Sequence, residues 1–158
     1  MADKFIQLAD TISSHEGKAY ITRDGVNREL FEVSSLSSQI DLVVASKRML
    51  GNRMTQHKVV GAEGTGSLTM YFMNSDALNQ TIHYLSTGRY NGINLQVWNE
   101  DSQSTVGKQE VLLTNVILNS IPAAILDDGS DDPITFDTDF TFDGIENLES
   151  FALPEIYR

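Results

Sequence analysis

The sequence predicts a mainly β fold: an antiparallel β-sandwich or barrel of about six to seven strands with one flanking α-helix. Apolar and polar residues alternate along most of the chain, which is the period of a strand. One segment instead repeats its apolar residues every three or four positions, as a helix does. Turn-forming residues separate several of the alternating segments. A chain of 158 residues without cysteine fits one domain whose core needs no disulfide.

A hairpin is expected first along the chain. Residues 17–24 alternate as a strand, Asp24-Gly25 suits a two-residue turn, and residues 26–40 fit one long return strand. We take residues 1–16 as an N-terminal extension and residues 17–158 as the domain.

Four more strands are expected at residues 67–72, 93–98, 111–121 and 134–143. The third of these slips phase near Asn115, as a bulge would produce. In the last, one face carries Ile134, Phe136, Thr138, Phe140 and Phe142, and the opposite face carries Thr135, Asp137, Asp139, Thr141 and Asp143.

The helix is expected between residues 76 and 87. Its apolar stripe is formed by Ala77, Leu78, Thr81, Ile82 and Leu85. Ser75 is the expected N-cap, Asp76 suits the positive helix start, and Gly88 lies where a terminating glycine belongs.

Residues 41–60 predict an extended arm. The segment is long and apolar for a surface loop and holds four of the 11 basic residues, and Gly51-Asn52 suits a two-residue hairpin turn. The candidate interface residues are Lys47, Arg48, Met49, Leu50, Gly51, Asn52, Arg53 and Met54. An apolar hairpin left in water would aggregate, so either its own domain or a neighbouring subunit covers it; we favour the neighbour.

The net charge of −11 is unevenly distributed. Residues 109–158 contain 11 Asp and Glu but only Arg158 as a cation, whereas residues 1–108 are almost balanced. Such acidity argues against gripping nucleic acid, although it is compatible with a surface that nucleic acid slides past. It also offers the basic arm a complementary surface. Solubility alone is the other explanation.

The sequence contains no complete phosphate-binding or metal-binding motif. The sequence Gly64-Thr65-Gly66-Ser67 lacks the lysine and helix of a phosphate loop and fits a turn leading into a strand. The three histidines have no metal-ligand spacing, and the acidic segment from Asp127 to Asp132 departs from the calcium-hand pattern. We therefore predict no catalytic residue, metal or cofactor. A spatially assembled hydrolase triad and a β-sandwich ligand-binding module stay open as alternatives.

The chain has no apolar run of about 18 residues that would span a bilayer. Its start, Met1-Ala2-Asp3-Lys4-Phe5, lacks the features of a secretory signal. We expect synthesis in the cytoplasm.

Several segments, in consistent order from Gly17 to Glu155, resemble the tail tube proteins of contractile phages and PBSX-type prophages. They are Thr55-Gln56-His57-Lys58, Gly64 to Phe72, Val97-Trp98-Asn99-Glu100-Asp101, Gly107-Lys108-Gln109, Leu118-Asn119-Ser120-Ile121-Pro122, Phe140-Thr141-Phe142-Asp143 and Leu153-Pro154-Glu155. None of these segments is a catalytic signature, so their shared order carries the resemblance.

The resemblance implies a structural subunit of the virion tail that forms hexameric rings, stacked into the inner tube of a contractile tail. It implies partners of four kinds: other copies of the chain, the tail sheath, the tape-measure protein, and baseplate or initiator proteins. DNA would pass through without specific binding, unless the particle is DNA-free and bacteriocin-like. It implies no enzyme activity, cofactor or small-molecule substrate. The inner tube of type VI secretion, similar in fold, is the alternative.

The acidic face of the last strand suggests a second role within such a tube. If Asp137, Asp139 and Asp143 point into the lumen, six copies in each ring would repel DNA phosphates near the wall. A solvent-facing or sheath-facing strand is the alternative.

Overall fold

The computed structural model describes residues 5–129 and 131–158. The chain divides into two compact units. Unit 1 comprises the chain up to Phe31 together with Asn91–Val116 and Gly144–Arg158, and unit 2 comprises Glu32–Tyr90 and Ile117–Asp143. Each unit is built on antiparallel strands, so the prediction of a mainly β antiparallel fold with a single helix is confirmed.

Unit 1 is an antiparallel sheet with the strand order β2-β1-β5-β6-β8. Its strands are β1 (Lys18–Arg23), β2 (Val26–Glu29), β5 (Ile93–Glu100), β6 (Lys108–Leu118) and β8 (Gly144–Glu149). Three short 3-10 turns flank them: η1 (Leu8–Asp10), η2 (Ser14–Glu16) and η3 (Glu155–Tyr157).

Two backbone details of unit 1 confirm the sequence prediction. Asp24 and Gly25 have φ angles of 51° and 80°, as a two-residue hairpin turn with two left-handed residues requires. Asn115 has a φ of 51°, and the register between β5 and β6 shifts opposite Asn94. The phase slip near Asn115 is therefore a β-bulge.

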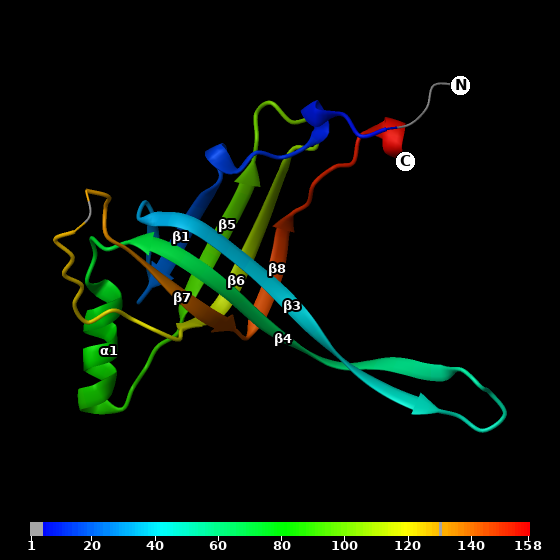
Figure 1. Ribbon diagram of the computed structural model, residues 1–158, viewed down its shortest axis with the longest axis horizontal. Helices are drawn as coiled ribbons and strands as arrows, with labels where there is room; N and C mark the ends of the chain where they lie inside the picture. Colours follow the sequence, from blue (N-terminus) through cyan, green and yellow to red (C-terminus); the bar gives the residue numbers. More distant parts are fainter. Residues whose placement is uncertain (1–4, 130) are drawn as a thin grey trace. The chain divides into compact units, whose positions relative to one another are not determined.

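Unit 2 contains β3 (Val33–Arg48), β4 (Thr55–Tyr71), β7 (Thr135–Phe142) and α1 (Asp76–Thr87). Strand β4 pairs with β3 on one side and with β7 on the other (Figure 1). The last two residues of β6, Ile117 and Leu118, pair with Thr141 and Phe140 on the free side of β7.

The prediction of one return strand over residues 26–40 is wrong. Strand β2 ends at Glu29, and β3 begins at Val33 in the other unit. The Leu30 amide donates to the Ala19 carbonyl at 2.8 Å, whereas the buried Glu32 carboxylate accepts from Asn74 Nδ2 at 2.8 Å. Of the residues between the two strands, Leu30 is thus held by unit 1 and Glu32 by unit 2. This split and the unpredicted β8 raise the count from six or seven strands to eight.

Most buried apolar side chains lie on alternate positions of the strands, as the sequence predicted. The exceptions are Leu30, which follows β2, and Leu113 and Val116, which are three positions apart because the bulge lies between them. In unit 1 the buried apolar side chains are Ala19, Ile21, Leu30, Ile93, Leu95, Leu113 and Val116, and in unit 2 they are Leu68, Phe140 and Phe142. Thr138 is buried beside the last two, on the predicted face of β7.

Gly64 and Gly66 do not form the predicted turn; both lie inside β4 and pair with β3 and β7. A Cβ atom on Gly64 would approach the Phe142 ring to 2.3 Å, and one on Gly66 would approach the Phe140 ring to 2.3 Å. The two glycines leave room for aromatic rings from the neighbouring strand to lie across β4.

Helix α1 begins and ends where the sequence predicts. Gly88 has a φ of 75° and its amide donates to the Tyr84 carbonyl at 2.7 Å, which is the expected glycine termination. Ser75 is the N-cap residue, as predicted, and its carbonyl accepts from the Asn79 amide at 2.9 Å. The Ser75 side chain makes no capping hydrogen bond; Asn74 Oδ1 instead accepts from the Asp76 amide at 2.8 Å. The helix has 12 residues, and none of the helices in the described part of the chain is long and apolar enough to cross a membrane.

Candidate assembly surfaces

The most prominent feature of unit 2 is a two-stranded arm. The pairing of β4 with β7 stops at Gly64 and Phe142, whereas the pairing of β4 with β3 continues from Asp41 and Glu63 to Arg48 and Thr55. Figure 1 shows the two strands running on past the end of β7 as a hairpin. We call residues 41–63 the arm.

Large apolar side chains on the arm are exposed. They are Leu42, Val43, Val44, Met49, Leu50, Met54, Val59 and Val60, and each is at least 49% exposed. Leu50, at the tip, is exposed completely. The arm is therefore not folded back onto its own unit, and water surrounds these side chains in the isolated chain.

The apolar face of the sheet continues onto the arm. Ile40, Leu42 and Val44 occupy alternate positions of β3 and so lie on one face, the face that carries Leu36 opposite buried Leu68. Up to the end of β7 the rings of Phe140 and Phe142 lie over this face of β4. The arm extends beyond these rings, and Leu42 is 60% exposed.

The arm tip is a six-residue turn, and the predicted two-residue turn at Gly51-Asn52 is wrong. The last strand pair is Arg48 with Thr55, which leaves residues 49–54 unpaired. Gly51 has a φ of 86°, and the Asn52 amide donates to the Met49 carbonyl at 3.3 Å. The β-turn therefore comprises residues 49–52 and begins one position earlier than expected. Gly51 is its third residue and has the left-handed conformation.

The arm is basic at its tip and on the strand residues beside it. Lys47, Arg48, Arg53 and Lys58 are exposed, and none of them forms an ion pair with another of the described residues. Four uncompensated cations beside exposed Met49, Leu50 and Met54 form a surface that is both apolar and positively charged.

The other face of the unit 2 sheet is polar and acidic. Cross-strand register places the following residues in rows, which we call the polar face: Asp137-Thr69-Ser35, Asp139-Ser67-Ser37, Thr141-Thr65-Gln39 and Glu63-Asp41. Thr69 Oγ1 donates to Asp137 Oδ1 at 2.6 Å, and Gln39 Nε2 donates to Asp41 at 3.2 Å. These rows hold four carboxylates and no cation.

The predicted acidic residues are only partly brought together. Asp137 and Asp139 are exposed on the polar face, but Asp143 lies beyond the last residue of β7, so its placement on the strand face is wrong. Sequence reasoning missed Asp41 and Glu63, which join the polar face from β3 and β4. Alternation alone could have flagged them only once the pairing of β3, β4 and β7 was known.

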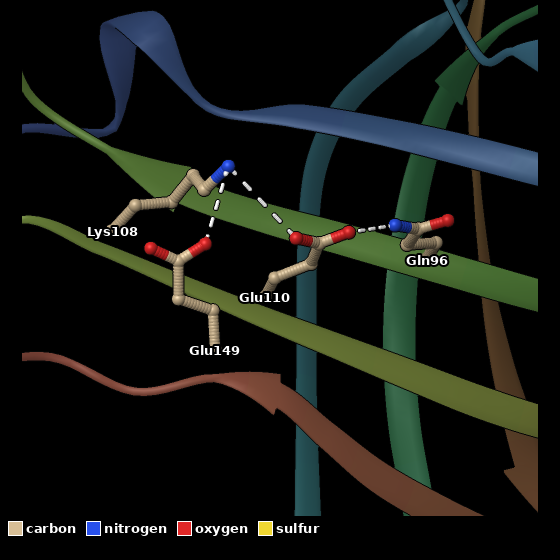
Figure 2. Close-up of polar contacts among 4 residues, drawn as sticks. All are labelled: Gln96, Lys108, Glu110 and Glu149. Carbon is tan, nitrogen blue, oxygen red and sulfur yellow. Dashed lines mark hydrogen bonds and ion pairs between the residues drawn. The ribbon is translucent and has the colours of Figure 1, made fainter.

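Unit 1 contains a polar cluster that the sequence did not reveal (Figure 2). Lys108 Nζ lies 4.5 Å from the centre of the Trp98 ring, 3.4 Å from Glu149 Oε2 and 3.9 Å from Glu110 Oε2. Gln96 Nε2 donates to Glu110, and Tyr20 packs on Trp98 at 5.1 Å between ring centres. The cation lies over an aromatic face and between two carboxylates, which ties β5, β6 and β8 together.

A second set of polar contacts holds the described part of the N-terminal segment, residues 5–16, in unit 1. Thr105 and Tyr157 both donate to the Asp10 carboxylate. The Ser102 amide donates to Glu16 at 2.5 Å, and the Ser13 amide donates to Asp101 at 2.8 Å. We call these contacts the N-terminal clasp.

Hydrogen bonding in the clasp shifts two pKa values. The hydroxyls of Thr105 and Tyr157 stabilise the Asp10 carboxylate, which lowers its pKa below the usual value. Donation to Asp10 in turn raises the pKa of Tyr157 above its usual value. Asp10 and Tyr157 thus form a hydrogen-bonded acid and phenol that attach the N-terminal segment to η3.

The residues considered for other chemistry lie apart. His15 is in η2, His57 in β4 and His83 in α1. The acidic segment with Asp127, Asp128, Asp131 and Asp132 is exposed between β6 and β7. Among residues 5–129 and 131–158 no group of three or more His, Asp or Glu side chains is arranged to hold a metal ion.

The comparisons agree with this architecture. The chain is 29% identical to the phage-like element PBSX protein XkdM of Bacillus subtilis (strain 168), over 95% of each chain. A solved chain in the sheath/tube terminator of the extracellular contractile injection system PVC superposes with a TM-score of 0.69 at 10% identity, covering 88% of this chain and 97% of that one. A chain in the tube-terminating cap of the anti-feeding prophage superposes with a TM-score of 0.68 at 12% identity, covering 94% and 97%.

These solved structures establish the fold, whereas the family is established by a match of the sequence itself. A family model described as phage tail tube protein matches residues 4–149, a span that begins inside the segment expected to be an N-terminal extension. The chain therefore belongs to the phage tail tube protein family.

Proposed function

We propose that this chain is a structural subunit that assembles into hexameric rings, and that the rings stack into the inner tube of a contractile tail. The observation that carries the proposal is the arm. Its large apolar side chains are at least 49% exposed in the isolated chain, and an apolar surface of this kind marks an interaction site.

The open edges of the sheets support the same role. In the described residues β3 pairs only with β4, so one side of this 16-residue strand keeps unpaired backbone groups. A long open edge invites pairing with a strand of another chain. Repetition of one heterologous contact closes a ring or continues as a filament. Sheath, tape-measure and baseplate or initiator proteins are the proposed further partners.

The arm can be tested by removing its tip. Replacing Met49–Met54 with Asn-Gly gives a two-residue turn compatible with the β3–β4 ladder. We expect this variant to fold, with an unchanged circular dichroism spectrum and melting curve. We also expect it to form no rings or tubes in negative-stain electron micrographs taken at high protein concentration, where the unaltered chain forms them.

A second variant separates the length of the tip from its side chains. Replacing the same six residues with a Gly-Ser sequence of equal length keeps the reach of the arm but removes Met49, Leu50, Arg53 and Met54. Loss of tubes in both variants assigns assembly to the side chains. Tubes of normal length from the Asn-Gly variant would refute the role of the arm.

We also propose that the polar face lines the lumen. Support comes from its composition, because Asp41, Glu63, Asp137 and Asp139 share it with hydroxyl and amide groups and no cation. Charges on such a wall act over about 8 Å at physiological salt, so they prevent phosphates from adhering without obstructing the channel. In this proposal DNA passes without specific binding.

The nature of the cargo is a separate question. The matched structures come from a prophage particle and from extracellular injection systems, so a DNA-free particle is the second candidate. Nuclease-treated particles that retain protected DNA would assign the chain to a DNA-carrying tail. Intact particles without protected DNA would assign it to a particle of the injection type.

A further inference from the structure

We infer that the basic arm tip of one copy docks on the exposed aspartates Asp127, Asp128, Asp131 and Asp132 of a second copy. This inference rests on the proposed function and names the surface that receives the arm. We call the exposed residues Leu126, Asp127, Asp128, Asp131 and Asp132 the acidic patch.

The arm tip and the acidic patch lie at opposite ends of the same sheet. The acidic patch precedes β7, whose first residue, Thr135, pairs with Tyr71 at the end of β4. The arm tip adjoins Thr55 at the beginning of β4. Strand β4 has 17 residues, so its ends are about 50 Å apart at the usual rise of a strand. Figure 1 shows this separation within unit 2.

This separation prevents the arm tip from contacting the acidic patch of its own chain. A β-hairpin of this length does not fold back on itself while its ladder is intact, and the ladder is paired from Ser35 to Arg48. The tip therefore has no route to the acidic patch of its own chain. A second copy supplies that patch without any change in the fold.

The two surfaces match in charge. The arm carries Arg53 at its tip and Lys47, Arg48 and Lys58 beside it, and the acidic patch has four aspartates within six positions. All eight side chains are exposed. Opposite charges of this density steer two chains into one register, while like charges suppress the reversed contact of arm with arm.

The two surfaces also match in apolar exposure. Leu50 on the arm tip and Leu126 beside the aspartates are the two most exposed large apolar side chains among the described residues, at 106% and 100%. Individual exposed ion pairs contribute little to affinity, so burial of these leucines supplies the attraction and the charges supply the orientation.

A contact between opposite ends is heterologous. The copy that receives an arm keeps its own arm free to dock on the next copy, so the association repeats until it closes or continues as a filament. The contact is thus of the kind that a ring or a stacked tube needs.

Charge exchange tests the pairing directly. In the arm variant Arg48→Glu/Arg53→Glu, and in the patch variant Asp128→Lys/Asp131→Lys, docking would bring like charges together. We expect each variant alone to lose sedimentable assemblies at low salt while keeping the circular dichroism spectrum of the unaltered chain. An equal mixture of the two, and a chain that carries all four substitutions, should both regain them. The four-substitution chain has the original net charge of −11, which controls for overall charge.

Each outcome has a distinct meaning. Normal assembly by both single-surface variants would overturn the pairing and leave the tube function standing. Loss of assembly without rescue in the mixture or in the combined chain would place the receptor of the arm elsewhere. Failure of the unaltered chain to form rings or tubes under all conditions, including the presence of its tail partners, would count against the proposed function itself.

Cross-linking provides a readout that does not require tubes. The chain has no cysteine, so Arg53→Cys/Asp128→Cys introduces one thiol on each surface of an otherwise thiol-free protein. Mild oxidation should give a ladder of disulfide-linked copies on non-reducing gels. The matched control is Arg53→Cys/Gln103→Cys, which moves the second thiol to an exposed position in unit 1. Equal ladders from both pairs, or no ladder from the first, would overturn the inference.

Discussion

At the scale of single residues, two glycines of β4 allow aromatic rings to pack directly against the backbone of the strand. Gly66 lies between its partners on β3 and β7, and an added Cβ would meet the Phe140 ring at 2.3 Å and the Ser37 carbonyl oxygen at 2.6 Å. The ring is fully buried and the carbonyl belongs to the backbone, so neither has room to move. A methyl group at this position must distort the sheet.

We therefore expect Gly66→Ala to lower the free energy of unfolding by about 1–3 kcal/mol, the usual cost of overpacking. Gly61→Ala on the same strand is the matched control, because its Cβ would lie 3.9 Å from Val43 in ordinary contact. That control should be neutral or slightly stabilising, since alanine restricts the unfolded chain. Urea unfolding of both variants measures the difference, and equal stabilities would contradict the steric explanation.

At the scale of elements, hydrogen bonds to carboxylates attach the N-terminal segment to the loop after β5 and to η3. Asp10 and Glu16 accept from donors at residues 102, 105 and 157. In the other direction, the Ser13 amide donates to the Asp101 carboxylate. The clasp joins segments separated by as many as 147 positions in the sequence. The two bonds that Asp10 accepts depend on its carboxylate remaining ionised.

Acid should release the clasp. The pKa of Asp10 is lowered in the folded chain, so its stabilising contribution is present above the unfolded value of 3.8 and is lost as the pH falls through the folded value. We expect faster amide hydrogen exchange in residues 7–16 at pH 3 than at pH 6, after correction for intrinsic rates. Asp10→Asn should show the faster exchange at both pH values. Unchanged protection at low pH would mean that other contacts hold the segment.

At the scale of the whole molecule, charge is concentrated on three surfaces. The arm tip is basic, the acidic patch is its proposed partner, and the polar face carries four carboxylates. A tube whose lumen is lined by the polar face would present repulsive charge to DNA in every ring.

Neutralising three carboxylates of the polar face tests the lumen. Asp143 lies beside the polar face rather than on it, so the variant takes its third carboxylate from β4. In Glu63→Gln/Asp137→Asn/Asp139→Asn we expect normal tubes but slower DNA ejection, because phosphates would adhere to a wall that repels them less. The charge-matched control is Asp24→Asn/Glu146→Gln/Glu155→Gln, which removes three exposed carboxylates from unit 1. Unchanged ejection kinetics in the first variant would remove the polar face from the lumen.

Features that depend on the local order of residues could be predicted from the sequence. Alternation located β1, β5 and β7, the phase slip located the bulge at Asn115, and the glycine at position 88 located the end of α1. It also identified residues 41–60 as an apolar and basic segment too long for a loop, because composition and length are visible without a fold.

Which strand lies beside which depends on tertiary packing and could not be predicted from the sequence. A period of two tells which side chains share a face, but it is the same for any neighbour, so it could not show that the chain changes partner between Glu29 and Val33. For the same reason Gly64 and Gly66 resembled a turn until Phe140 and Phe142 were seen to lie over them. Asp41 and Glu63 joined the polar face, and Asp10 met Tyr157, through pairings between residues distant in sequence. Those pairings depend on packing, which no local pattern records.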